Sequence, residues 1–394
     1  MNDFSFNILQ KCEFGMGALN KLPEFLKQCG SDSVFLVSDR GLEAIGVVQK
    51  VRDIIANAGM KYGEYLDVLP NPTVQIVDEC AKAYKASGCQ AWIALGGGSP
   101  MDVAKAAGVV AKFGGSITDY EGGGKIPADI DPLIAVPTTA GTGSEVTVFT
   151  VITDESRNYK LTAFGPQISP KYAILDPELI MTAPPHIAAA CGIDAFIHAM
   201  EAYINTAATP FTDALGEKAM YLIGKYLRRF VANRQDEEAA NAMMVASTFA
   251  GVSFAFARLG NIHAMSHPVS AFYHVPHGVA NATLMPAILE YNKIGDREGR
   301  YAKIYEFVTG KTAGADFDPQ MTVDAIIDFN KAIGIPTGIL AAIQNMDPKV
   351  TEADVRKNFP AMAADAMKSG NVLVNPRRSN AKDIEALYER ALFF

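Results

Sequence analysis

Short apolar runs alternate with longer amphipathic segments through the first 180 residues of the chain. The apolar runs have the length of buried strands, and we predict strands over residues 33–37, 63–69, 91–95 and 133–136. Apolar positions between these runs recur with the period of a helix, which predicts helices over 47–58, 73–87 and 101–112. Apolar strands that alternate with helices indicate a parallel sheet covered on both faces.

The pattern changes near residue 180, where long helical segments replace the strands. The apolar spacing predicts helices over 188–204, 211–231 and 236–256, followed by further helical segments up to Phe394. Prolines interrupt regular structure between 176 and 185 (DPELIMTAPP). A chain of 394 residues exceeds the usual size of one domain. We therefore predict an α/β domain over 1–180 and an all-helical domain over 181–394.

The composition is that of a soluble protein with a large core, since 49% of the residues are hydrophobic and 20% are charged. The net charge is −8 and no basic stripe is present, which argues against nucleic acid and anionic membranes as partners. No apolar stretch is expected to reach membrane-spanning length, and the start MNDFSFNILQ shows no export signal. Five cysteines without close pairing fit free thiols, and together these features favour a cytoplasmic protein.

A glycine-rich loop, Gly96–Ser99, separates the predicted strand 91–95 from the helix that follows it. In a parallel sheet, ligands bind beyond the carboxyl ends of the strands, where this loop lies. Ser99 is expected as the helix N-cap, with Pro100 at the first helical position and Asp102 at the third. The free N–H groups of such a helix N-terminus suit a pyrophosphate. The spacing matches no standard phosphate-loop fingerprint, so a purely structural turn is the alternative.

Two further strand ends carry polar groups suited to a nucleotide. The segment 138–145 (TTAGTGSE) is dense in hydroxyls and glycine, and it could wrap a ribose and phosphates or form a plain turn. Asp39 closes the strand 33–37, where an acid can accept hydrogen bonds from a ribose hydroxyl and repel a 2′-phosphate. The alternative role for Asp39 is a helix cap.

Five of the six histidines gather in two segments, CGIDAFIHAMEAY and GNIHAMSHPVSAFYHVPHG. Asp194 and His198 lie four residues apart, as do His263 and His267, so each pair would share one face of a helix. Carboxylate and imidazole groups suit a divalent first-row metal such as Fe(II) or Zn(II). Spacing alone does not decide which four of the following seven residues would bind it: Asp194, His198, Glu201, His263, His267, His274 and His277.

The motifs GGGSPMDVAKA, PTTAGTGSE, DAFIHAMEAY and HAMSHPVSAFYHVPHGVAN together resemble those of the iron-dependent (group III) alcohol dehydrogenases, the family of lactaldehyde reductase and 1,3-propanediol dehydrogenase. The resemblance covers essentially the whole chain. It implies a Rossmann-like dinucleotide-binding domain followed by an all-α metal-binding and substrate domain, in a dehydroquinate synthase-like fold. The metal ligands that it implies are Asp194, His198, His263 and His277. The residues that it implies around NAD(H) are Asp39, Asn71, Gly97, Gly98, Ser99, Asp102, Thr138, Thr139, Thr147, Lys160 and Leu179.

The resemblance also implies the chemistry. Fe(II), or Zn(II) in its place, acts as a Lewis acid on the oxygen of an alcohol or aldehyde while hydride passes between the substrate and NAD(H). His267 is expected beside the metal as the catalytic proton relay, and Pro268 is expected to interrupt the helix there. Phe254 and Leu259 are expected to wall a pocket for short alcohols and aldehydes. We also expect a homodimer or a higher homo-oligomer.

Other functions remain open at this point. The substrate could be an anionic or otherwise functionalised aldehyde (lactaldehyde-like, 3-hydroxypropanal-like or sulfonated) if Arg258 or a lysine faces the pocket. A related metalloenzyme could use NAD without net redox, as dehydroquinate synthase-like proteins do. A non-catalytic scaffolding protein is disfavoured, because every catalytic position that the resemblance implies is filled. His274 stands where many relatives carry Asn or Asp, and a surface position is expected for it.

Overall fold

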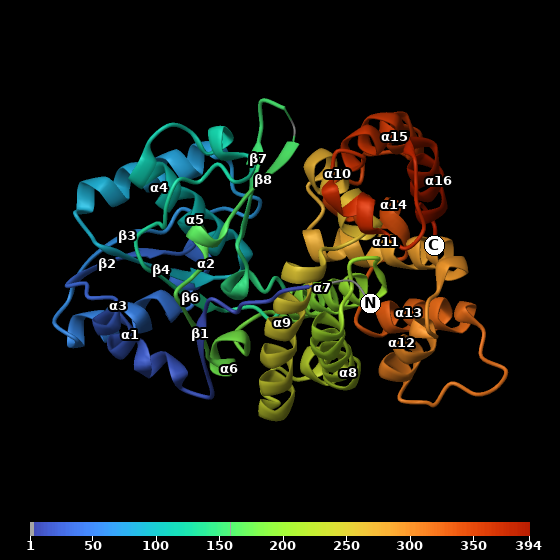
Figure 1. The fold of residues 1–394 in the computed structure, drawn as a ribbon, viewed down its shortest axis with the longest axis horizontal. Helices are drawn as coiled ribbons and strands as arrows, with labels where there is room; N and C mark the ends of the chain where they lie inside the picture. Colours follow the sequence, from blue (N-terminus) through green and yellow to red (C-terminus); the bar gives the residue numbers. More distant parts are fainter. Residues whose placement is uncertain (1–3, 158) are drawn as a thin grey trace. The chain divides into compact units, whose positions relative to one another are not determined.

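The computed structural model describes residues 4–157 and 159–394, and the chain divides into two compact units (Figure 1). The first unit, Asn7–Ala183, contains the strands and is called the α/β unit below. The second contains the helices of Pro184–Phe394, to which residues 4–6 also belong, and is called the helical unit. The fold class predicted from the apolar pattern is confirmed.

Six parallel strands form the main sheet of the α/β unit, in the order β1-β9-β6-β4-β2-β3. The chain passes from β2 to β3 at one edge and then returns to β4 on the other side of β2, so the order reverses between β2 and β4. Ligands of such sheets bind at this reversal, beyond the carboxyl ends of the strands. The strands are β1 (Lys11–Phe14), β2 (Ser33–Val37), β3 (Lys61–Tyr65), β4 (Ala91–Gly96), β6 (Leu133–Pro137) and β9 (Tyr172–Leu175).

Apolar side chains cover both faces of this sheet. Trp92 and its neighbours on one face pack with α4 and α5, whereas Ile93 and its neighbours on the other face pack with α1 and α3 (Figure 1). Because both faces are buried, the central strands read as continuous apolar runs, and this made them predictable. The four helices are α1 (Leu22–Gln28), α3 (Val47–Asn57), α4 (Val74–Ser87) and α5 (Gly98–Phe113).

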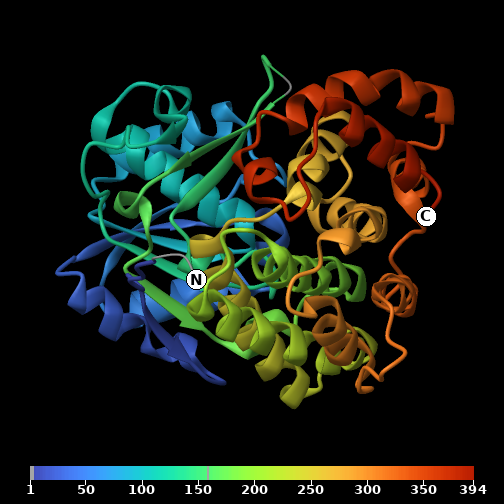
Figure 2. The same ribbon diagram turned by 45° about the vertical axis from the view of Figure 1, so that its right-hand side comes forward.

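A second, three-stranded sheet was not predicted from the sequence. β7 (Phe149–Asp154) and β8 (Tyr159–Phe164) form an antiparallel hairpin (Figure 1 and Figure 2). β5 (Gly122–Gly123) pairs with β8. Residues along β7 alternate between buried and half-buried, so the strand lacks the continuous apolar run of the main sheet. The short helical elements of this unit are η1 (Ala18–Lys21), α2 (Arg40–Ala44), η2 (Ile117–Tyr120), η3 (Ser144–Val146), η4 (Pro166–Ile168) and α6 (Pro177–Ile180).

The helical unit is centred on the long helices α7, α8 and α9, which pack against one another and confirm the three helices predicted from the apolar spacing. A glycine permits one close approach in this unit, because a Cβ on Gly224 of α8 would lie 2.1 Å from the carbonyl oxygen of Phe307 in α12. The helices are α7 (Pro185–Ile204), α8 (Pro210–Ala232), α9 (Glu237–Ala257), α10 (Asn261–Tyr273), α11 (His277–Asn292), η5 (Lys293–Gly295), α12 (Arg300–Thr309), α13 (Pro319–Ala332), α14 (Gly338–Met346), α15 (Glu352–Ala366), η6 (Gly370–Val374) and α16 (Ala381–Ala391).

Two of these helices correct the expectation that no apolar stretch reaches membrane-spanning length. By length and composition alone, α7 with 20 residues and α9 with 21 residues could cross a membrane. In the folded chain, 89% of the most apolar window of α7 and 61% of that of α9 are buried inside the protein. A core helix that is enclosed by neighbouring helices has the same apolar composition as a spanning helix, which explains the resemblance.

Candidate active site

Four potential metal ligands meet inside the helical unit, from helices that are distant in the sequence. Asp194 and His198 come from α7, His263 from α10 and His277 from α11, and one ligand atom of each lies within 4.8 Å of the others. From the Asp194 carboxylate, the nearest Nε2 atoms of His198, His263 and His277 lie at 3.9, 3.7 and 4.0 Å. Four donors at about 2.0–2.2 Å from one common ion would lie about 3.3–3.6 Å apart in a tetrahedron, so a bound ion would draw these atoms slightly closer together.

Local structure explains how these residues come together. Asp194 and His198 occupy the same face of α7 one turn apart, as their spacing predicted. His277 is the first residue of α11, directly after Pro276 at the N-cap. The start of α11 approaches α7 closely, because a Cβ on Gly278 would lie only 2.1 Å from the carbonyl oxygen of Ala190. The glycine of the Pro-His-Gly turn therefore lets His277 reach Asp194.

The charges of this cluster are enclosed. Asp194, His198 and His263 are at most 5% exposed, while the side chain of His277 is 29% exposed. Burial alone would raise the pKa of Asp194, but the surrounding His198, His277 and His263 lower it well below its usual range. Burial lowers the pKa of His263, but its bonds to Asp194 and Glu201 outweigh this and raise it to about 9. A divalent cation would supply the positive charge that this enclosed carboxylate requires, so the donor set fits a metal.

Glu201, one of the seven candidates, lies behind the cluster. Its Oε2 is 2.6 Å from Nδ1 of His263, and its Oε1 accepts a hydrogen bond of 2.7 Å from the backbone N–H of Ile262. The carboxylate thereby holds a proton on Nδ1 of His263, so Nε2, on the side of Asp194, is the nitrogen that would bind a metal in place of a second proton. A carboxylate behind a ligating imidazole orients the ring and raises its basicity.

Asn281 of α11 was missed by sequence reasoning. It is fully buried, and its Nδ2 donates a hydrogen bond of 2.7 Å to Oδ1 of Asp194. The same nitrogen lies 3.0 Å from Nε2 of His263 and 3.1 Å from Nε2 of His277. The only signal in the sequence is its spacing of four residues after His277, which a neutral amide does not make conspicuous.

The glycine-rich loop after β4 differs in detail from its prediction. Helix α5 begins at Gly98 with Gly97 as the N-cap, so the assignment of Ser99 to the N-cap is wrong. Asp102 does not cap the helix either, because its carboxylate accepts hydrogen bonds from the hydroxyl of Ser144 at 3.1 Å and from the N–H of Val151 at 3.2 Å. Burial is the main cause that raises the pKa of Asp102 to about 6. Asp102 therefore makes its hydrogen bonds to Ser144 in η3 and Val151 in β7, and not to the backbone at the start of its own helix.

The loop after β6 lies directly against this helix start. The N–H of Thr138 donates to the carbonyl oxygen of Gly96 at 3.0 Å. A Cβ on Gly97 would lie 3.2 Å from the hydroxyl of Thr139, and one on Gly98 would lie 3.0 Å from the side chain of Thr142. The structure therefore brings together the two loops that the sequence analysis proposed for a nucleotide, at neighbouring strands β4 and β6.

The remaining predicted cofactor residues are spread around the α/β unit. Asp39 caps α2, with its Oδ1 accepting a hydrogen bond of 2.9 Å from the N–H of Leu42, and it follows β2 at the reversal of strand order. Lys160 donates to the side-chain oxygen of Asn71 at 2.7 Å. Leu179 of α6 is buried in the apolar core. Thr147 is also buried.

Comparison with known proteins follows the same division of the chain. A family model described as iron-containing alcohol dehydrogenase matches residues 10–177, and one described as Fe-containing alcohol dehydrogenase family, C-terminal, matches residues 188–392. NAD-dependent methanol dehydrogenase of Bacillus methanolicus is 36% identical over 380 residues, which cover 96% of this chain and 97% of that protein. Lactaldehyde reductase of Escherichia coli (strain K12) is 36% identical over 384 residues, with coverage of 96% and 97%.

The fold agrees with these relatives. A solved structure of 1,3-propanediol oxidoreductase superposes with a TM-score of 0.92 at 33% identity, over 99% of this chain and 100% of that chain. The chain belongs to the iron-containing alcohol dehydrogenase family. The family and the enzyme class expected from the motifs are confirmed, and relatives named for NAD support the expected nicotinamide cofactor.

In this alcohol dehydrogenase, the other two histidines of the two segments are His267, which borders the clustered His277, and His274. The ring of His267 lies 5.4 Å from that of His277, measured between centroids. Helix α10 runs through Pro268 to Tyr273, so the expected interruption of the helix is wrong. His274 is exposed and ends α10 in the left-handed conformation, with φ of 57°. The expected surface position of His274 is confirmed.

The segment before α10 borders the histidines. The ring of Phe254 stacks on that of His198, with centroids 4.5 Å apart, and Leu259 is buried. Arg258 is exposed, and its Nη1 would lie 3.6 Å from a Cβ on Gly370 in η6. Phe256, the other phenylalanine of this segment, contacts the ring of Phe211 edge-on.

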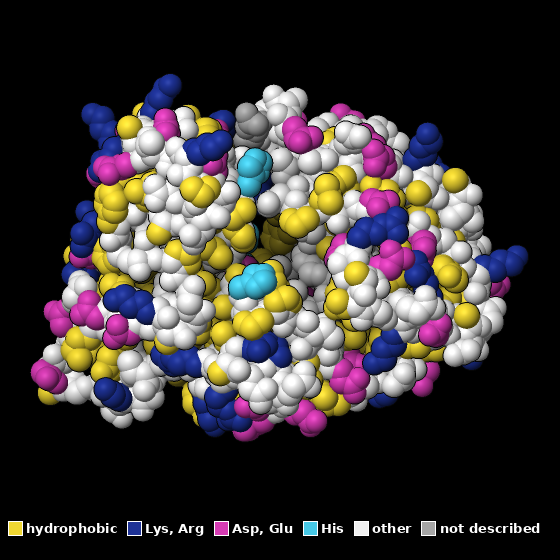
Figure 3. Space-filling model, turned by 180° about the vertical axis from the view of Figure 1, so that it is seen from behind, with side chains coloured by type: hydrophobic (Ala, Val, Ile, Leu, Met, Phe, Trp, Pro, Cys, Tyr) yellow, Lys and Arg dark blue, Asp and Glu magenta, His cyan; other side chains and the backbone are white. Residues whose placement is uncertain are grey.

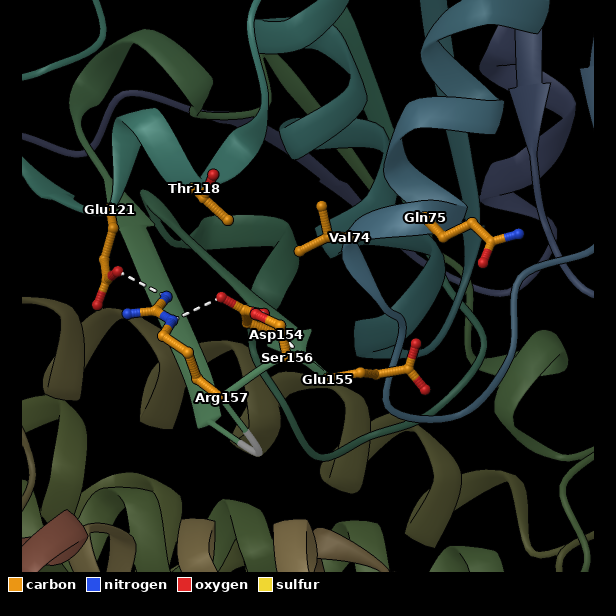
Figure 4. A pocket seen from close by; sticks show the side chains of 8 residues that line it. All are labelled: Val74, Gln75, Thr118, Glu121, Asp154, Glu155, Ser156 and Arg157. Atoms are coloured by element: carbon orange, nitrogen blue, oxygen red, sulfur yellow. Dashed lines mark hydrogen bonds and ion pairs between the residues drawn. The ribbon is translucent and has the colours of Figure 1, made fainter.

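A separate hollow of about 540 Å³ lies in the α/β unit of this alcohol dehydrogenase (Figure 4). It is lined by the start of α4, by η2 and by the β7–β8 turn, and Arg157 there pairs with Asp154 and Glu121. Figure 4 shows polar side chains around an open space. None of the predicted cofactor residues lines it, so it adds nothing to the candidate site.

Proposed function

We propose that this protein reduces short aldehydes with NADH, using a divalent metal, Fe(II) or Zn(II), held by Asp194, His198, His263 and His277. The observation that carries the proposal is the enclosed carboxylate with three imidazole rings turned toward it. A cation bound there supplies Lewis acidity toward the oxygen of the substrate. Glu201 keeps Nε2 of His263 turned to the cluster.

We propose that residues 1–180 bind NAD(H) and that residues 181–394 hold the metal and the substrate. The nicotinamide supplies the hydride, and the protein positions it. The N-terminus of α5 at Gly97 and Gly98 offers free N–H groups to the pyrophosphate. Asp39 stands at the end of β2, where a carboxylate suits the ribose. The further residues proposed around NAD(H) are Asn71, Ser99, Asp102, Thr138, Thr139, Thr147, Lys160 and Leu179.

We propose that the substrate is small and uncharged, because Phe254 presents an aromatic ring beside His198. Leu259 is proposed as a second apolar wall residue. The exposed Arg258 lies near Gly370, which favours a neutral aldehyde over an anionic one. A charged aldehyde would leave its anionic group beside an aromatic ring, where it loses hydration without gaining a partner.

We propose that the protein works as a cytoplasmic homo-oligomer with small-molecule partners. Exposed apolar side chains lie before, at the end of and after the edge strand β1: Ile8 and Leu9, Phe14, and Met16. An apolar sheet edge is a surface on which a second copy would bury area. On the face shown in Figure 3, basic side chains are interspersed with acidic ones. This distribution and the net charge of −8 favour a small molecule over a nucleic acid.

The reaction is tested with metal-analysed protein, NADH or NADPH, and a panel of aldehydes. We expect NADH-dependent reduction of straight-chain aldehydes of about two to four carbons, because the ring of Phe254 limits the space beside His198. Consumption of NADH, followed by its absorbance, gives kcat/KM for each aldehyde. No turnover of any aldehyde by the metal-loaded protein would refute the reaction, and a strong preference for aromatic or long aldehydes would refute the pocket.

Asp39 is tested with Asp39→Asn, because an amide oxygen can still cap α2 while the negative charge is lost. We expect the preference for NADH over NADPH to fall by about tenfold, equivalent to about 1.4 kcal/mol. The matched control is Asp53→Asn at an exposed carboxylate of α3. The measurement is kcat/KM for both cofactors. Equal use of NADPH and NADH by the unsubstituted enzyme would contradict the role of Asp39.

His267 is proposed to pass a proton between the substrate oxygen and solvent, from outside the set of metal ligands. His267→Ala should retain its metal and lose about a hundredfold or more in turnover, the usual size of a general acid–base contribution. His274→Asn is the control, since Asn tolerates the left-handed conformation of that exposed position. Metal content and kcat are measured together. Loss of metal from His267→Ala would indicate that His267 is a metal ligand. Unchanged turnover with the metal retained would indicate that His267 only packs against its neighbours.

A further inference from the structure

Lys105 of α5 is a charged side chain in the interior of the α/β unit, with no exposed surface. Its ammonium nitrogen lies 2.7, 3.1 and 2.9 Å from the carbonyl oxygens of Ser144, Thr147 and Phe149. The hydroxyl oxygens of Ser144 and Thr147 lie 2.9 and 3.3 Å from the same nitrogen. Oxygen atoms of one short segment, from η3 to the start of β7, therefore surround one cation. This segment, residues 144–149, is called the clamped segment below.

Burying a lysine costs free energy, and packing alone does not explain its presence. Burial lowers the pKa of Lys105 to about 8, while Asp102 and Glu145 act in the opposite direction. An apolar residue of similar length, such as Met, would fill the same space without that cost. An ammonium group additionally fixes the backbone, because it holds together three carbonyl oxygens that would otherwise repel one another.

The clamped segment carries part of the proposed NAD(H) site. Thr147 belongs to it, and Asp102, almost one turn before Lys105 on α5, binds Ser144 within it. Asp102 also accepts the N–H of Val151 just beyond it. Lys105 and Asp102 therefore join the first turns of α5, which the pyrophosphate is proposed to meet, to the segment that presents Thr147.

We propose that Lys105 is a positioning residue for NAD(H), acting through the clamped segment. It sets where Thr147 stands relative to the N-terminus of α5, so both are in place before the cofactor arrives. Its nitrogen is enclosed by protein oxygens, which excludes it as a nucleophile or base toward the substrate. The inference rests on the proposed function, since it takes the α/β unit as the NAD(H) site.

The test is Lys105→Met, which keeps the length of the side chain and removes the cation. We expect the Kd for NADH, measured by fluorescence titration, to rise about tenfold or more, equivalent to about 1.4 kcal/mol. The KM for NADH should rise in parallel, while kcat at saturating NADH and the metal content stay near those of the unsubstituted enzyme. A purely structural loss would instead lower Tm and the active fraction without changing Kd, and that result would overturn the proposal.

The matched control is Lys112→Met on the same helix, where the side chain is exposed and pairs with Asp131 at 3.0 Å. It should leave the Kd for NADH unchanged. Ser144→Ala removes one hydroxyl contact to Lys105 and one to Asp102, so it should raise Kd about threefold even if Lys105→Met does not fold. An unchanged Kd in Ser144→Ala, or an equal rise in Lys112→Met, would refute the role of Lys105. If the unsubstituted protein itself bound no NADH, the proposed function would fail instead.

Discussion

The Asp194 carboxylate, enclosed with three imidazole rings, is the constraint around which the helical unit is organised. A carboxylate that is almost fully buried must be compensated, and the side chains around it are three imidazole rings and the neutral amide of Asn281. A divalent cation resolves this, because it needs the donors that the cluster provides. The approach of α11 to α7 at Gly278 and the bond from Glu201 to His263 both serve to bring those donors to one point.

The α/β unit also contains a buried charge that holds separate segments together, but this charge is positive. Lys105 is a buried cation that gathers backbone oxygens, whereas Asp194 is a buried anion that gathers ring nitrogens. In both places a charge inside the protein fixes segments that are far apart in the sequence. The proposed chemistry depends on this, because hydride transfer requires the nicotinamide and the metal-activated carbonyl to be held in a fixed geometry.

The sequence predicted the parts whose signal is local. The central strands and long helices are visible as apolar runs and helical spacing, and the pair Asp194 and His198 is visible from its four-residue interval. The hairpin of β7 and β8 and the edge strand β1 were missed, because half-exposed strands lack a continuous apolar run. The strand β9 was missed although all four of its residues are buried, because so short a run carries little signal by itself. Ser99 was misassigned to the helix cap, since α5 already begins at Gly98, and Asp102 finds partners across the fold rather than at the helix start. Asn281 and Lys105 act through contacts that no spacing along the chain reveals.

The metal content of His263→Ala shows whether the four clustered side chains hold a metal. The protein is stripped of metal, reconstituted with Fe(II) without oxygen or with Zn(II), and analysed for bound metal. His186→Ala removes an exposed histidine of α7 and serves as the control. We expect a single bound ion per chain in the unsubstituted protein and in the control, and an affinity at least about a hundredfold weaker in His263→Ala. A folded His263→Ala protein that binds the metal with undiminished affinity would contradict this expectation.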